Sequence, residues 1–84
     1  MKELITEYLD ELEGSTKNVR FTRLLTICEN VFGDCRVKGS HHIFKTPWPG
    51  NPRVILQPKK GGKAKSYQVK QVVQALKKRR DQLG

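Results

Sequence analysis

Two adjacent histidines, His41 and His42, are the residues of this chain best suited to proton-transfer chemistry. They follow a Gly39-Ser40 pair and open a short β-branched and aromatic run that reaches Phe44. The unperturbed pKa of histidine, about 6.5, allows the side chain to donate and accept protons near neutral pH. In a strongly basic protein, a histidine on a strand beside a turn is suited to act on a phosphodiester.

Residues that flank the histidines could support such chemistry. Lys38 and Lys45 are cations that could stabilise a phosphorane-like transition state, and Ser40 could hydrogen-bond a phosphate or orient an imidazole. Asp81 is the one carboxylate side chain after Asp34, so the sequence predicts no metal site and no cofactor. Because side chains alternate along a strand, the two histidines should face opposite sides unless the strand is bulged.

The net charge of +9 is unevenly distributed along the chain. Residues 1–34 hold four bases and seven acids, whereas residues 35–84 hold thirteen bases and one acid. This asymmetry favours a polyanionic partner, with nucleic acid ahead of an anionic membrane surface or an acidic protein. Four lysines around a Gly-Gly pair are suited to phosphate contacts that do not read sequence. They are Lys59, Lys60, Lys63 and Lys65.

Length and composition predict one domain over residues 1–84, with a single small core. No apolar run approaches the roughly 18 residues of a membrane span, and the acidic N-terminus is unlike a signal peptide. We therefore expect a cytoplasmic protein without a membrane partner. Cys28 and Cys35 lack C-x-x-C spacing, which predicts buried, reduced side chains.

Apolar periodicity predicts two helices in the first part of the chain. One apolar stripe runs from residue 4 to residue 12 and ends at Gly14. It would cover the core or contact a partner. A second helix should begin near Arg20, with Asn18 as its N-cap and Gly33 as a left-handed C-terminal cap.

Three antiparallel strands and a last helix should follow. The strands are expected at 35–38, 41–46 and 53–57, with a proline-rich turn at 47–52 between the second and third. Trp48 in this turn could stack on a base, close the sheet edge or contact a partner. A flexible basic loop at 59–65 would lead to a helix that Ser66 caps and whose inward stripe is apolar. The stripe consists of Val69, Val72, Val73 and Leu76.

The α-β-β-β-α order from residue 20 onward is that of double-stranded-RNA-binding domains. Residues 36–45, followed by Pro47, Arg53-Val54 and Pro58-Lys59-Lys60, resemble the HicA toxin family. The resemblance covers roughly residues 20–80. Its most specific element is a Gly-Ser/Thr-(x)-His-x-x-aromatic pattern. Gly39, Ser40, His41 and Phe44 match this pattern.

The resemblance implies an α+β, double-stranded-RNA-binding-domain-like core at residues 20–82, with an additional N-terminal helix at 1–14. It implies a type II toxin that cleaves mRNA without a metal and is neutralised by a HicB-type antitoxin. His41 would be the catalytic group, as general base or general acid, with His42 as the alternative. Two other functions remain open: a non-catalytic module that binds structured RNA, and a basic adaptor for an acidic protein.

Overall fold

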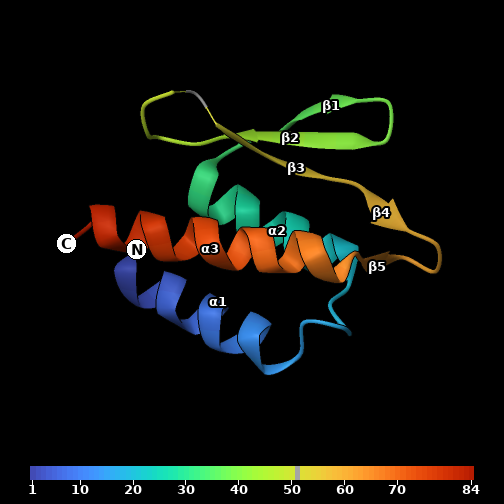
Figure 1. Ribbon diagram of the computed structural model, residues 1–84, viewed down its shortest axis with the longest axis horizontal. Helices are drawn as coiled ribbons and strands as arrows, with labels where there is room; N and C mark the ends of the chain where they lie inside the picture. The colour runs from blue at the N-terminus through green and yellow to red at the C-terminus, as the bar shows by residue number, and fades with distance from the viewer. Residues whose placement is uncertain (51) are drawn as a thin grey trace.

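The computed structural model describes residues 1–50 and 52–84 (Figure 1). Asn51, in the predicted proline-rich turn, lies outside the described residues. Figure 1 shows a three-stranded sheet on one side of helices α2 and α3, with helix α1 on the other side of α3. The arrangement is α+β, as predicted. Within the described residues, no helix is both long enough and apolar enough to span a membrane.

The predicted apolar stripes of the helices are confirmed. Helix α1 spans Lys2–Gly14 and packs against α3, which spans Ser66–Gln82. The first helix therefore covers the core. Helix α2 spans Phe21–Phe32 and lies beneath strand β2 (His41–Lys45). The buried residues of α1 are Ile5, Tyr8, Leu9 and Leu12, and those of α3 include Val69, Val72, Val73 and Leu76.

Two predicted helix caps are wrong. Arg20 occupies the N-cap position of α2 without a side-chain cap, and Asn18 instead accepts a 3.5 Å hydrogen bond from Lys63 Nζ. Ser66 is the first residue of α3, and no side chain caps that helix. At α2 the backbone substitutes for a cap, because Phe21 N donates to the Gly62 carbonyl at 3.0 Å.

The C-terminal end of α2 agrees with the prediction in part. Gly33 has the expected positive φ of 90°, and its N–H donates to the Glu29 carbonyl at 2.9 Å. Its ψ of −165° lies outside the left-handed helical region, so the chain leaves the helix extended. Glycine suits this position, since residues with a Cβ rarely adopt such a backbone conformation.

The predicted three-stranded meander is confirmed. Strand β1 (Arg36–Lys38) pairs antiparallel with β2, and β2 pairs antiparallel with β3 (Arg53–Leu56). Phe44, Val54 and Leu56 are buried on the face toward the helices. The alternate residues therefore form an outer face of the sheet, away from the core.

The predicted flexible basic loop is wrong, because this segment forms a hairpin. Strand β4 (Pro58–Lys59) pairs with β5 (Lys63–Ala64), and Gly61 and Gly62 reverse the chain at φ of 91° and 75°. Ala64 N also donates to the Val19 carbonyl at 2.8 Å. The hairpin is thus hydrogen-bonded to the segment that leads into α2.

Candidate nucleic-acid interface

The two histidines lie on opposite faces of the sheet, as the pleat predicts. His41 is exposed on the outer face. His42 is half-buried on the helix side, where its ring meets the Phe21 ring edge-on at a centroid distance of 5.2 Å. Its Nδ1 lies 3.8 Å from Cys35 Sγ. Only His41 therefore presents its imidazole freely to a ligand on the outer face.

Strand register shows which of the two lysines that flank the histidines in sequence lies beside His41. Lys38 is the direct cross-strand partner of His41, whereas Lys45 pairs with Arg53 at the other end of β2. Directly opposed residues in an antiparallel pair have Cβ atoms roughly 5 Å apart, while four residues along a strand span about 13 Å. Lys38 is thus the cation beside His41, and Lys45 is not part of the same cluster.

The turn before His41 is held by a chain of side-chain hydrogen bonds. Gln57 Nε2 donates to Ser40 Oγ at 3.0 Å, and Gln57 N donates to Gln68 Oε1 at 3.0 Å. Gln68, in the first turn of α3, is buried. Gly39 permits the turn itself through a φ of 63°. These bonds fix the His41 end of the sheet to the start of α3.

Gln57 and Gln68 are site residues that sequence reasoning missed. Gln57 ends a predicted strand, and Gln68 directly precedes the apolar stripe of α3. A polar residue beside a buried stripe is the one signal the sequence offers, since a buried amide needs hydrogen-bond partners. The partner that fixes Gln68 is the backbone N–H of Gln57, between β3 and β4, which only the tertiary structure brings near.

The lysine-rich hairpin lies at the same end of the sheet as His41. Gln57, which holds Ser40, is followed directly by strand β4, and Figure 1 shows the hairpin and the β1–β2 turn at the same end of the molecule. Lys59, Lys60 and Lys63 are exposed, and Lys65 is half-buried. A backbone bridge to Lys63 places Arg20, a further exposed cation missed from sequence, beside the hairpin.

The outer face of the sheet is basic along its length. The register places Lys38 with His41, Arg36 with Ile43, and Lys45 with Arg53 in successive rows. Each of the charged members is exposed, and no strand residue is acidic. Arg36 and Arg53 join the predicted cations on this face, which becomes evident once the register is known.

Trp48 closes the opposite end of the core. Its ring meets Phe32 edge-on at 6.0 Å, and Lys78 Nζ lies 4.7 Å from the ring centroid. The side chain is half-buried against the core cluster. Of the three roles that the sequence left open for Trp48, the contacts come nearest to closure, but Trp48 covers the end of the core against α2 and α3 rather than the edge of the sheet.

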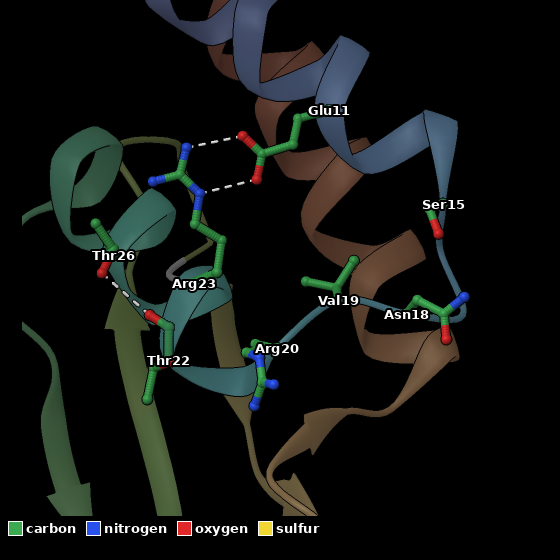
Figure 2. Close-up of a pocket in the computed structure, with 8 residues that line it drawn as sticks. All are labelled: Glu11, Ser15, Asn18, Val19, Arg20, Thr22, Arg23 and Thr26. Atoms are coloured by element: carbon green, nitrogen blue, oxygen red, sulfur yellow. Dashed lines mark hydrogen bonds and ion pairs between the residues drawn. The ribbon is translucent and has the colours of Figure 1, made fainter.

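A separate pocket of about 460 Å³ lies between α1 and α2 (Figure 2). In Figure 2 Glu11 and Arg23 face each other, joined by hydrogen bonds of 2.7 and 2.8 Å. The hydrogen bond from Arg23 lowers the pKa of Glu11, and the same bond raises the pKa of Arg23. None of the site residues predicted from the sequence lines this pocket, but Arg20, which lies beside the basic hairpin, does.

The cysteines are free, and burial protects one of them. Desolvation of Cys28 raises its pKa to about 12, so its thiol stays protonated at neutral pH. Cys35 is half-buried beside His42, less enclosed than the sequence predicted. Among the residues that the structure describes, no three His, Cys, Asp or Glu side chains gather to hold a metal ion.

The arrangement combines an exposed imidazole, a neighbouring ammonium group and a basic hairpin at one end of the sheet. Comparison with known proteins adds nothing to this description, because no family model, curated protein or solved structure matches the chain. Any functional conclusion therefore rests on the residues and their geometry.

Proposed function

We propose that this chain is an endoribonuclease that cleaves mRNA without a metal ion, with His41 as its catalytic residue. The observation that carries the proposal is the position of exposed His41 opposite Lys38, at the end of the sheet where the basic hairpin is anchored. An imidazole handles the proton near neutral pH, and cations hold and polarise the phosphate.

The reaction needs few groups. As general base, His41 takes the proton of a ribose 2′-OH while the 2′-oxygen attacks the adjacent phosphorus. The bond from phosphorus to the 5′-oxygen breaks, and that oxygen takes a proton from the imidazolium or from water. The ammonium group of Lys38 stabilises the negative charge that accumulates on the phosphoryl oxygens.

The proposed fold relationship is to double-stranded-RNA-binding domains. The order α2-β1-β2-β3-α3, with both helices on one face of the sheet, supports this relationship. Such domains contact RNA mainly through its shape, phosphates and 2′-hydroxyls. The basic hairpin directly before α3 supplies cations suited to that role.

The toxin role and the partner follow from the resemblance of residues 36–60 to the HicA family. In this proposal the protein blocks translation by cutting mRNA, and a HicB-type antitoxin neutralises it. A small acidic protein with a DNA-binding segment, encoded in the adjacent reading frame, would be that antitoxin. Co-expression with it should restore growth of cells that express the chain.

Substitution of each histidine tests the catalytic assignment. Expression of the wild-type chain should arrest growth, and the purified protein should cleave RNA in the presence of EDTA. His41→Ala should abolish cleavage and arrest while retaining RNA binding. His42→Ala is the matched control: it should still cleave, but its thermal midpoint should fall because it loses the contact with Phe21. Undiminished cleavage by His41→Ala would contradict the assignment.

A second candidate is a module that binds structured RNA without cleaving it. The basic outer face of the sheet and the anchored hairpin favour it, because both could hold phosphates without any chemistry. Two results would select this alternative. The wild-type protein would bind RNA in a salt-sensitive way and leave it intact, and any effect of expression on growth would be the same for wild type and His41→Ala.

A further inference from the structure

Tyr67 is an exposed aromatic residue that the proposed reaction does not use. Its side chain is 56% exposed in the first turn of α3. The cations closest in sequence are Lys65 and Lys70, and Lys63 of the hairpin lies a short distance before them. An aromatic ring within a basic surface is the combination by which proteins hold single-stranded nucleic acid.

A series of hydrogen bonds connects the Tyr67 side chain to the His41 end of the sheet. The Tyr67 hydroxyl lies 3.5 Å from Gln68 Nε2, and the other amide atom of Gln68 accepts the bond from Gln57 N. The side chain of Gln57 in turn holds Ser40, the residue before His41. The phenol end of Tyr67 is thus connected to the catalytic turn through two glutamines.

We infer that Tyr67 is a stacking platform for an unpaired nucleobase of the RNA, an inference that rests on the proposed function. Both faces of a base inside a duplex are covered by the neighbouring pairs, so away from the duplex ends only an unpaired base can lie against an aromatic ring. The substrate is then RNA with an unpaired nucleotide close to the phosphate that His41 attacks. A continuous duplex would contact the hairpin lysines but leave Tyr67 unused.

Binding measurements with three RNAs test this inference. They are a single strand, a perfect duplex and the same duplex with one bulged nucleotide, each titrated with His41→Ala protein so that the RNA stays uncleaved. Adding Tyr67→Ala should weaken binding of the single strand and the bulged duplex by about 5- to 150-fold, the range for loss of one stacked base. Affinity for the perfect duplex should stay unchanged.

Two further variants separate stacking from charge and from the hydroxyl group. Tyr67→Phe retains the ring and should bind all three RNAs like its parent. Lys70→Ala, which removes an exposed cation from the next turn of α3, should weaken binding of all three RNAs to a similar extent. Light-induced crosslinking of 5-iodouridine RNA to protein that retains Tyr67 should label the peptide containing that residue, a readout that does not require the alanine variant to fold.

Each outcome bears on a different claim. If Tyr67→Ala changes all three affinities equally or not at all, or if crosslinks avoid Tyr67, the stacking role is overturned while RNA cleavage by His41 stands. If no RNA binds the parent protein, the proposed function fails first, and the role of Tyr67 fails with it.

Discussion

Single residues in this protein acquire their roles from the faces on which they lie. His41 and His42 are chemically identical neighbours, yet one is exposed opposite a lysine and the other packs against Phe21 and Cys35. Their separation could be predicted from the alternation of side chains along a strand. Which of Lys38 and Lys45 lies beside His41 could not be predicted, because it depends on how two strands align.

Substitution of the two lysines should therefore give unequal effects. Lys38→Ala removes the cation that faces His41 and should slow single-turnover RNA cleavage by about 10-fold or more, with recovery in Lys38→Arg. Lys45→Ala, at the far end of the strand, should leave the rate at saturating protein nearly unchanged. Equal losses in both variants would contradict the assignment of Lys38.

At the scale of elements, the β4–β5 hairpin holds the lysines of this segment in an ordered, hydrogen-bonded structure. Its sequence, Lys-Lys-Gly-Gly-Lys, suggests a mobile loop, since nothing local reveals a partner. The hydrogen bonds that order it come from Val19 and Phe21, more than forty residues earlier in the chain. The helices and the three main strands were predictable because their periodicity is local, whereas the hairpin, the true caps and the Gln57–Gln68 bond depend on tertiary contacts.

Gly62 provides a test of this element. At its φ of 75° an alanine is strained, so Gly62→Ala should lower the free energy of unfolding by about 1 kcal/mol and weaken RNA binding. Gly14→Ala is the matched control, because Gly14 lies at the end of helix α1 with open space around the position of a Cβ. That change should be neutral or slightly stabilising. Denaturant unfolding and RNA titration measure both, and equal destabilisation would count against the constrained turn.

Over the whole molecule, acidic side chains are concentrated in helix α1 and are missing from the sheet and the hairpin. Helix α1, farthest from the sheet, carries five of the eight acidic residues, while the sheet and hairpin carry none. Positive potential is thus concentrated on the sheet side of the fold, where the candidate interface lies. The sequence predicted this asymmetry along the chain, and the layering converts it into an asymmetry in space.

Salt dependence of binding should reveal which layer contacts RNA. Each phosphate neutralised contributes about 0.7 to 0.9 to the slope of log affinity against log salt concentration. Lys60→Ala, in the hairpin turn, should reduce the slope by roughly that amount. Lys2→Ala, on acidic helix α1, should leave it unchanged. Equal slopes for Lys60→Ala and wild type would place the RNA elsewhere.

The bonds between the hairpin and the start of α2 have a consequence for synthesis of the protein. A ribosome makes Val19 and Phe21 more than forty residues before their partners Gly62 and Ala64, and the helix that carries Gln68 comes later still. A nascent chain without them lacks α3, and with it much of the core. The candidate interface can therefore assemble only after both the hairpin and α3 have left the ribosome, so its formation is a late, long-range step of folding rather than a local one.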